Sequence, residues 1–410
     1  MVTVRPFKAI RPAKKYVDKV AAPPYDTMNT QEARQMARDN EFSYLRIDRA
    51  EIDLDENTDI HDKRVYEKAA ENLNDFLEKG VFQKEEEECL YIYREIMDSR
   101  AQVGIVGCVS VDESLTGKIK KHEKTKPDKV EDRTNHIRYC GANTGTILLT
   151  YHENEELDLF IDNKMKEEPL YDFISDDDVR HTVWILKGDD RDRVENLFKQ
   201  VDNLYIADGH HRAAAGERYA LDQRELNPDY DKNDEFNYYL AMIAPKNNLY
   251  VMDYNRVVED LNGLEFEEFM KKVEENFFIE ELEQEFKPEK KYDYGMYIDK
   301  KWYKISYKKA DELADDIIEK LDVSVLHDNL IEPILGILVP QRDKRIDFIG
   351  GIRGVGEIKK RVDEGMRVGF SLYPTSVEEL MKVADEDEIM PAKSTWFEPK
   401  VRCGLFLHEL

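Results

Sequence analysis

The sequence predicts an α/β fold whose strands form a mixed sheet of the α+β type. Short apolar runs of strand length alternate with longer, charged, helix-like segments along most of the 410 residues. The neighbouring runs 89–96 and 102–111 form a predicted strand pair, and 294–307 alternates like a hairpin, so part of the sheet should be antiparallel. A chain of this length can bury a large core and hold two or three subdomains.

The first eighty residues are expected to contain two strands, two helices and a rigid loop. The paired prolines of VAAPPYD (20–26) exclude a helix and favour an extended loop. Segment 62–80 has the apolar spacing of a long amphipathic helix and ends at Gly80. The remaining elements are strands at 5–10 and 43–48 and a short helix at 30–40.

The middle of the chain is rich in predicted strands. The charged stretch 118–145 is too polar for a core, and a helix is expected at 192–201. The apolar runs that predict strands are 146–151, 158–161, 181–186, 204–206, 237–245 and 249–254.

The C-terminal part divides into two predicted regions. Residues 256–320 combine an acidic helix, 263–277, with the hairpin, which turns at Asp299 and Lys300, and should form an inserted helix-plus-hairpin subdomain. Residues 1–255 would then form the α/β core, and 321–410 a C-terminal α/β segment that completes the active cleft. The elements expected in this last segment are helices at 323–337 and 358–365, strands at 345–351 and 368–373, and a helix opened by the capping box SVEE (376–379).

Composition limits the classes of function. Lysine and arginine number 61 against 88 acidic residues, and the formal charge of −27 argues against nucleic acid and anionic membranes as partners. The four cysteines lack CxxC spacing, which indicates reduced thiols and no zinc ribbon. No segment approaches the ~20 apolar residues of a membrane span, and the N-terminus lacks the apolar core of a signal peptide. We therefore expect a soluble, cytoplasmic protein.

The clearest functional signal is the stretch NLYIADGHHRAAAGERYA, residues 203–220. A predicted strand ends at Asp208 and Gly209, and an alanine-rich helix follows. Asp208 can cap this helix, whose N-terminus can bind an anion. Arg212 in the first turn suits a phosphate but opposes the helix dipole, and it should contribute little to a core. These features predict a phosphate site.

The two histidines of this stretch, His210 and His211, are adjacent. Neighbours on a helix lie about 100° apart and cannot readily chelate one metal together. A phosphate site with acid–base histidines therefore fits better than a zinc site. The other interpretation is an ordinary strand-to-helix turn with exposed polar residues.

Two further clusters are candidates for chemistry. KKHEKTKPDKVEDR places Glu123 and Lys124 near Asp132 and Arg133, where carboxylates can act as a base or bind Mg²⁺ and the basic groups can neutralise phosphate. The alternative is a solvated loop with compensating charges. Near the C-terminus, tryptophan and phenylalanine in MPAKSTWFEPKVRCG suggest a segment held against the body of the protein, which would bring Lys393 to a cleft.

At ADGHHRAAA the sequence resembles the ParB/sulfiredoxin superfamily, whose nucleotide-binding members carry a Gly-x-His-Arg element at a strand–helix junction. Free-serine kinases in that superfamily carry the similar form Asp-Gly-His-x-Arg, and in them an upstream glutamate acts as base. Over its full length, the chain is similar to a bacterial and archaeal domain-of-unknown-function family (number one thousand and fifteen). The matching stretches are VAAPPYD, KHEKT with the following EDR, IADGHHR, DFIGGIRG and MPAKSTWFEPKVRCGL.

The superfamily resemblance implies a ParB/sulfiredoxin-like core and a phosphotransferase that uses ATP or ADP and Mg²⁺ on a small hydroxyl compound, with free L-serine the leading acceptor. Glu123 or Asp26 would take the hydroxyl proton, with His210 and His211 as further catalytic candidates, and Asp208 and Asp132 would help to hold the metal. The residues expected to bind nucleotide phosphate are Asp208, Gly209, His210, His211, Arg212, Lys124, Arg133 and Lys393.

The same anion site leaves two other functions open. A phosphatase acting on phosphoserine would use water as the acceptor. A non-enzymatic nucleotide-binding switch of the ParB kind would bind nucleotide with little turnover and change its oligomeric state. A homodimer is one assembly that the sequence allows.

Overall fold

The computed structural model describes all residues, Met1–Leu410, as two compact units. The first unit comprises Met1–Lys121, Thr125–Leu249 and Pro399–Leu410, and the second comprises His122–Lys124 and Tyr250–Glu398. Helices and strands occur in both units, so the predicted mixed α/β class is confirmed. None of the helices has the length and apolar character needed to cross a membrane.

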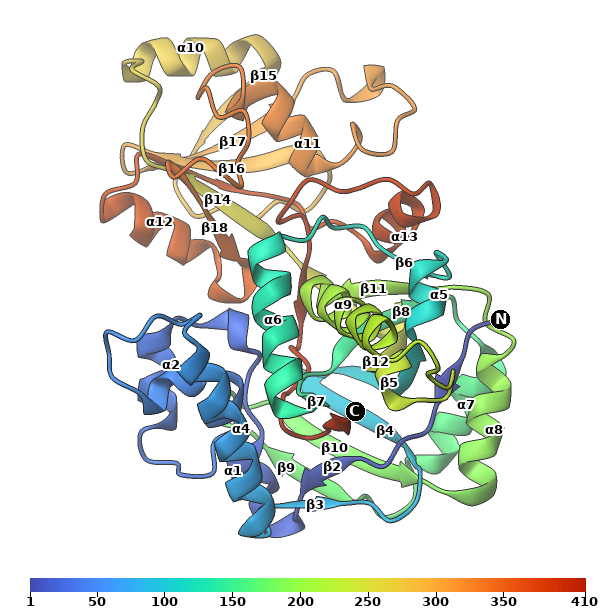
Figure 1. The fold of residues 1–410 in the computed structure, drawn as a ribbon. Coiled ribbons are helices and arrows are strands. Elements are labelled where there is room, and N and C mark those ends of the chain that lie inside the picture. Colours follow the sequence, from blue (N-terminus) through green and yellow to red (C-terminus); the bar gives the residue numbers. More distant parts are fainter. The chain divides into compact units, whose positions relative to one another are not determined.

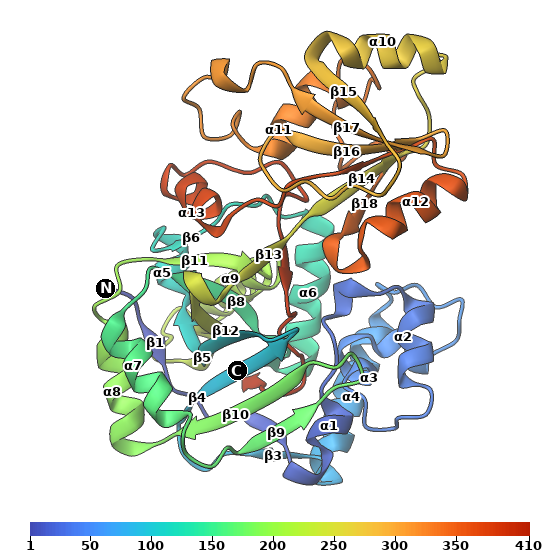
Figure 2. The same ribbon diagram turned by 180° about the vertical axis from the view of Figure 1, so that it is seen from behind.

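The first unit is built on a nine-stranded sheet with strand order β6-β11-β8-β12-β5-β4-β10-β9, in which β1 pairs with β5 (Figures 1 and 2). The pairs β6–β11 and β8–β12 are parallel and the other pairs are antiparallel, so the sheet is mixed as predicted. The strands are β1 (Val4–Arg5), β4 (Leu90–Met97), β5 (Arg100–Ser110), β6 (Ile119–Lys120), β8 (Ile147–Tyr151), β9 (Tyr171–Ile174), β10 (Arg180–Leu186), β11 (Leu204–Asp208) and β12 (Tyr238–Pro245).

Small residues bring helix α9 close to this sheet. Ala213 and Ala220 are fully buried in the main apolar core, and a Cβ at Gly216 would lie 3.2 Å from Cβ of Tyr239 on β12. Two short strand pairs complete the unit: β2 (Ile10–Pro12) with β3 (Phe82–Lys84), and β7 (Ala142–Asn143) with β21 (His408–Glu409). The helices are α1 (Val17–Val20), α2 (Thr30–Ala37), α3 (Leu45–Asp48), α4 (Lys63–Glu78), α5 (Val111–Leu115), α6 (Pro127–Cys140), α7 (Glu155–Lys164), α8 (Gly188–Phe198) and α9 (His210–Leu226).

The second unit is built on a six-stranded antiparallel sheet of order β15-β17-β16-β19-β14-β18. Ile358 of α12 packs on one face with Val257 and Ile349, and α11 lies against the other, where the Tyr294 hydroxyl donates to the Asp322 carbonyl. The elements are β13 (Tyr250–Met252) paired with β20 (Trp396–Glu398), β14 (Tyr254–Val258), α10 (Phe266–Asn276), β15 (Phe277–Leu282), β16 (Asp293–Ile298), β17 (Lys301–Tyr307), α11 (Asp322–Leu326), a π-helix (His327–Ile331), β18 (Ile346–Gly350), α12 (Val355–Asp363), β19 (Val368–Ser371) and α13 (Val377–Asp385).

Two local predictions for the second unit are confirmed. The hairpin turns at Asp299 and Lys300, both with positive φ, and the Ser376 side chain caps α13 in a capping box with Glu379. Residues 256–320, which we expected to be a subdomain of their own, contribute β15, β16 and β17 to the same sheet as β18 and β19. The six-stranded sheet thus joins the two predicted C-terminal regions.

Several element predictions were wrong. Segment 43–48 contains helix α3, because a short apolar run does not distinguish a strand from a buried helical turn. Segment 158–161 lies within α7, which begins earlier because the Asn154 side chain caps it. The charged stretch, for which no element was predicted, contains helix α6, which begins at Pro127 and is followed by left-handed Gly141. The helix predicted over 323–337 is shorter in the structure, where it consists of α11 and the π-helix and ends at Ile331. The strand predicted over 5–10 is replaced by two short strands, β1 and β2.

Candidate functional site

The predicted strand–helix junction is present in the first unit. Strand β11 ends at Asp208, Gly209 adopts a φ of +96°, which favours glycine, and α9 begins at His210. The N-cap residue is Gly209, not Asp208 as expected. The Asp208 carboxylate accepts a hydrogen bond from the Gly209 N–H at 2.8 Å and pairs with Lys400 at 2.6 Å. It therefore stabilises the turn and does not cap the helix.

The two histidines of the motif have different environments. His210 is buried, whereas His211 is half-buried and its Nε2 accepts the Lys126 N–H at 3.1 Å. A ring nitrogen that accepts a hydrogen bond carries no proton, so His211 is in its neutral form here. Because Lys126 directly precedes α6, this bond joins the N-termini of α6 and α9.

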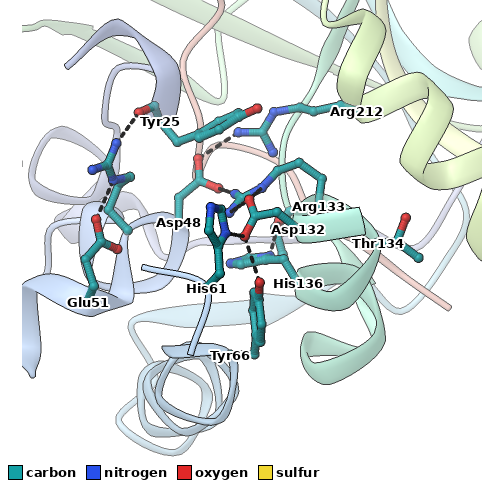
Figure 3. Close-up of polar contacts among 12 residues, drawn as sticks. Tyr25, Asp48, Glu51, His61, Tyr66, Asp132, Arg133, Thr134, His136 and Arg212 are labelled. Carbon is teal, nitrogen blue, oxygen red and sulfur yellow. Dashed lines mark hydrogen bonds and ion pairs between the residues drawn. The ribbon is translucent and has the colours of Figure 1, made fainter. Parts of the chain in front are cut away.

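Arg212 is bound to a buried carboxylate that the sequence analysis did not identify (Figure 3). Its Nη2 donates to Oδ2 of Asp48 at 2.7 Å, and the Asp48 side chain is 0% exposed. Arg133 of α6 donates from Nη1 to the other oxygen of Asp48 at 3.3 Å. One carboxylate at the end of α3 therefore connects α6 and α9.

The two guanidinium groups share further contacts. The Tyr25 ring centroid lies 4.2 Å from Cζ of Arg133 and 4.8 Å from Cζ of Arg212, within the range of cation–π attraction. A Cβ at Gly145 would lie only 2.1 Å from Nη1 of Arg212, so any larger residue there would displace the guanidinium. Tyr25 and Gly145 thus fix the arginine in place.

The arginines differ in their remaining hydrogen bonds. Arg133 uses Nε, Nη1 and Nη2 on Asp48 and Asp132. Arg212 uses Nη2 on Asp48 and on Cys403 Sγ, while its Nε and Nη1 have no acceptor in the protein. Each nitrogen of the Arg133 guanidinium therefore has an acceptor in the protein, whereas two nitrogens of Arg212 have none and are available for a ligand.

Burial and charge set the protonation states of this cluster. Burial alone would raise the pKa of Asp48, but the charges of Arg212 and Arg133 outweigh it and lower that pKa. Burial lowers the pKa of His136 to about 4, so this ring is neutral at pH 7. Its Nε2 donates to the Ile47 carbonyl at 2.9 Å, and its Nδ1 accepts from Thr144 Oγ1 at 3.1 Å. The cluster is thus a buried ion network with a neutral histidine beside it.

The predicted metal ligands already have hydrogen-bond donors. Asp132 accepts from the Tyr66 hydroxyl at 2.8 Å, lies 3.2 Å from His61 Nδ1, and binds Arg133 with its other oxygen. Asp208 is occupied by Gly209 and Lys400, as described above. Neither carboxylate has an oxygen free of donors, so the residues present do not form a ready Mg²⁺ site, and a magnesium site here stays a prediction.

Asp26, in the PPYD loop, is a carboxylate of this region that has no hydrogen-bond donor. It is exposed and accepts no hydrogen bond from the protein, yet it lies near enough to Arg212 to contribute to the raised pKa of that arginine. The structure therefore brings Asp26, Asp132, Arg133 and the 208–212 motif together in the first unit.

The other predicted site residues, Glu123, Lys124 and Lys393, belong to the second unit. Lys124 is exposed, and Lys393 has a positive φ and lies with Nζ 5.3 Å from the Tyr254 ring centroid. The same unit contains another potential metal-binding group, in which His327 Nε2 lies 3.4 Å from a carboxylate oxygen of Glu332 and Asp328 is adjacent.

Sequence analysis missed three residues of the site and misjudged a fourth. Asp48, Tyr25 and Gly145 were not proposed, although Tyr25 lies in a stretch that the family resemblance includes. Arg212 was expected to contribute little to the core, but its ion pair with a fully buried carboxylate makes it part of the packed structure. Asp48 lies 164 residues from Arg212, and no local pattern indicates such a pairing.

Solved structures resemble the chain distantly. Free serine kinase in complex with AMP matches with 14% identity and a TM-score of 0.36, over 73% of this chain and 92% of that one. A conserved hypothetical protein from Pyrococcus furiosus matches with 14% identity and a TM-score of 0.34, over 73% and 95%. SbnI with C-terminal truncation from Staphylococcus aureus has 12% identity and a TM-score of 0.40, over 73% and 85%. Likeness at this level assigns no activity.

A family model matches most of the chain. No curated protein matches the sequence significantly. One family model, described as "Protein of unknown function (DUF1015)", matches residues 4–324. This match covers most of the chain, contains the stretches VAAPPYD, KHEKT with EDR, and IADGHHR, and agrees with the family resemblance stated from the sequence. The chain therefore belongs to the DUF1015 family.

Proposed function

We propose that the protein is a nucleotide-dependent phosphotransferase that acts on a small hydroxyl compound, with free L-serine the leading acceptor. The observation that carries this proposal is Arg212 at the first turn of α9, fixed by Asp48 and with Nε and Nη1 lacking an acceptor. A helix N-terminus and a guanidinium group both favour phosphate oxygens. The resemblance of the DGHHR motif to nucleotide-binding elements supports the same ligand.

The proposed role of the cluster is to hold the donor phosphates in a fixed geometry. Phosphoryl transfer depends mainly on positioning and on stabilising the charge of the transferred group. Asp48, Tyr25 and Gly145 hold the Arg212 guanidinium before a ligand arrives, so little reorganisation is needed on binding. No step is assigned to a metal, because Asp132 and Asp208 have no free oxygen.

The acceptor needs a base. In the proposed reaction, Asp26 takes the proton of the acceptor hydroxyl, whose oxygen forms a bond to the terminal phosphorus of ATP or ADP. The bond from that phosphorus to the bridging oxygen breaks, which leaves ADP or AMP. Asp26 is favoured because it is exposed and makes no hydrogen bond within the protein. Glu123 of the second unit remains the competing candidate.

A transfer assay tests this proposal. Purified protein is incubated with ATP or ADP and L-serine, and phosphoserine is measured by mass spectrometry. Asp26→Asn should lower turnover by about 10²–10⁴-fold, the usual contribution of a general base. Asp39→Asn, at another exposed aspartate of the first unit, is the matched control and should leave turnover unchanged. Glu123→Gln, tested in parallel, decides between the two carboxylates.

A nucleotide-binding switch is the second candidate. It is favoured by the way Asp48 joins α3, α6 and α9, because a phosphate that competes for Arg212 would loosen contacts among all three helices. A protein that binds nucleotide, changes its oligomeric state and transfers phosphate to no hydroxyl acceptor would be a switch, and the kinase proposal would be wrong.

A further inference from the structure

Arg256, on strand β14 of the second unit, is a buried charge without a partner. It is 1% exposed and is among the largest fully buried side chains of the protein. Its side chain makes no hydrogen bond or ion pair, and Nε and Nη1 are buried without an acceptor. The guanidinium lies over an aromatic ring, with Cζ 5.6 Å from the centroid of Phe348.

Such a group is unusual in a folded protein. Buried charges are nearly always paired, because an ion removed from water without compensation strongly destabilises the fold. Burial lowers the pKa of Arg256 only to about 10, so the side chain keeps its charge at pH 7. No carboxylate of the protein forms an ion pair with the Arg256 guanidinium. The protein itself therefore provides no counterion.

Two polar side-chain atoms in α11 and the π-helix that follows it also lack partners. Arg256 lies directly across from Phe348 on β18 and Phe370 on β19. Ser324 Oγ and His327 Nδ1 are buried without hydrogen bonds. These two residues are three apart in α11 and the π-helix that follows, so they lie on one side of this segment.

The alternation of side chains along the strands places Arg256 on the face of the sheet against which α11 lies. Val257, the neighbour of Arg256 on β14, packs with Ile358 of α12, so the Arg256 side chain points to the opposite face of the sheet. On that opposite face, the Tyr294 hydroxyl donates to the Asp322 carbonyl at the start of α11 at 2.9 Å. Ser324 and His327 therefore add unsatisfied polar groups on the side of the sheet to which Arg256 points.

We propose that Arg256, Ser324 and His327 form a buried binding site for a small carboxylate, a function separate from phosphate transfer in the first unit. A carboxylate has two oxygens that match the planar fork of a guanidinium, and the Ser324 hydroxyl can donate a further bond. One arginine balances the single charge of a carboxylate, whereas a phosphate carries nearly two charges at neutral pH. The small exposed fraction of Arg256 favours a small ligand, so formate and acetate are suitable probes.

Thermal unfolding of the full chain tests the site. The wild type and Arg256→Met are melted in a zwitterionic buffer that lacks carboxylates and chloride, and then with increasing formate, acetate, chloride or phosphate. Without added anion, Arg256→Met should melt at a higher temperature than the wild type, because an unpaired buried charge has been replaced by an apolar side chain. With formate or acetate at about 100 times Kd, the wild-type Tm should rise by roughly 5–10 °C, while that of Arg256→Met stays unchanged.

Two further variants make the result decisive. Arg367→Met removes an arginine of the same unit that pairs with Asp299, and it should respond to the anions like the wild type. Arg256→Gln keeps hydrogen-bond donors without the charge, and it should lose the response even if Arg256→Met does not fold. An equal response of the wild type and both Arg256 variants, or no response of the wild type, would overturn the site. A response to chloride or phosphate alone would overturn the carboxylate assignment.

Discussion

The two units differ in whether the protein supplies a counterion for its arginines. In the first unit, Arg212 and Arg133 share the carboxylate of Asp48 and stack on Tyr25. In the second unit, Arg256 is more deeply buried, with 1% of its surface exposed, but contacts no acceptor. The first unit therefore folds with its counterion built into the chain, whereas the second leaves a charge that we propose an external anion compensates.

The difference shows two ways to prepare an anion site. Arg212 is held by an internal carboxylate and keeps two nitrogens for a ligand, so the site is formed before the ligand binds. Arg256 has no internal carboxylate, so ligand binding and the stability of the second unit should be coupled. The following predictions test this comparison, beginning with the largest expected effect.

Removal of the internal counterion should strongly destabilise the first unit. Asp48→Asn leaves Arg212 and Arg133 buried without their shared carboxylate, and loss of one partner of a buried ion pair costs about 3–5 kcal/mol. Denaturant unfolding measures this loss. Asp75→Asn, which breaks an exposed pair with Lys79, is the control and should cost at most about 1 kcal/mol. Equal stability of the two variants would mean that the buried network contributes nothing.

The stabilities of the two units should change with pH in opposite directions. Burial lowers the pKa of His136 in the first unit to about 4, so the stability from its neutral form is lost as pH falls from 6.5 through 4. Burial raises the pKa of Asp322 in the second unit to about 7, so the stability from its protonated form is lost as pH rises from 3.8 through 7. The respective limits are about 3 and about 4 kcal/mol.

Hydrogen exchange followed by mass spectrometry measures both units in one experiment between pH 4.5 and 8. His136→Gln should remove the loss of protection in acid from the first unit, and Asp322→Asn should remove the loss near neutral pH from the second. If each variant keeps the pH dependence of the wild type, these two groups do not control it.

A smaller effect is expected at Gly145. An alanine there would place a Cβ 2.1 Å from Nη1 of Arg212 and force the guanidinium out of its position. Overpacking of this kind costs about 1–3 kcal/mol, and nucleotide affinity should fall with it. Gly356→Ala is the control, because a Cβ there meets only Glu285 at 3.7 Å. Unchanged affinity of Gly145→Ala would show that the position of Arg212 is not important for binding.

The sequence predicts the parts of this protein that depend on local rules. Periodicity and turn residues identified α4, the β4–β5 pair, the 299–300 hairpin and the β11–α9 junction. Segments 43–48 and 158–161 were assigned to the wrong class because their apolar runs are short and burial, not periodicity, decides their structure. The charged stretch was not recognised as containing α6, whose apolar face is small.

The site was predictable only in part. The Gly209–Arg212 motif is contiguous, so its residue types indicated an anion site. Asp48 acquires its role from contacts with Arg133 and Arg212, which are 85 and 164 residues away. Arg256 did leave a local signal, because a charge stands within the apolar strand YNRVV, but only the structure shows that nothing balances it.

The measurement that tests the central claim most directly is calorimetric titration of ATP and ADP into the wild type, Arg212→Met and Arg218→Met. Arg212→Met keeps the Asp48–Arg133 pair, so circular dichroism should show a folded protein. Arg218 is an exposed arginine on the same helix. If Arg212 holds the nucleotide phosphates, Arg212→Met should weaken binding by roughly 1.5–3 kcal/mol, or about 10–150-fold, while Arg218→Met binds like the wild type. Equal nucleotide affinity of folded Arg212→Met and the wild type would contradict the account.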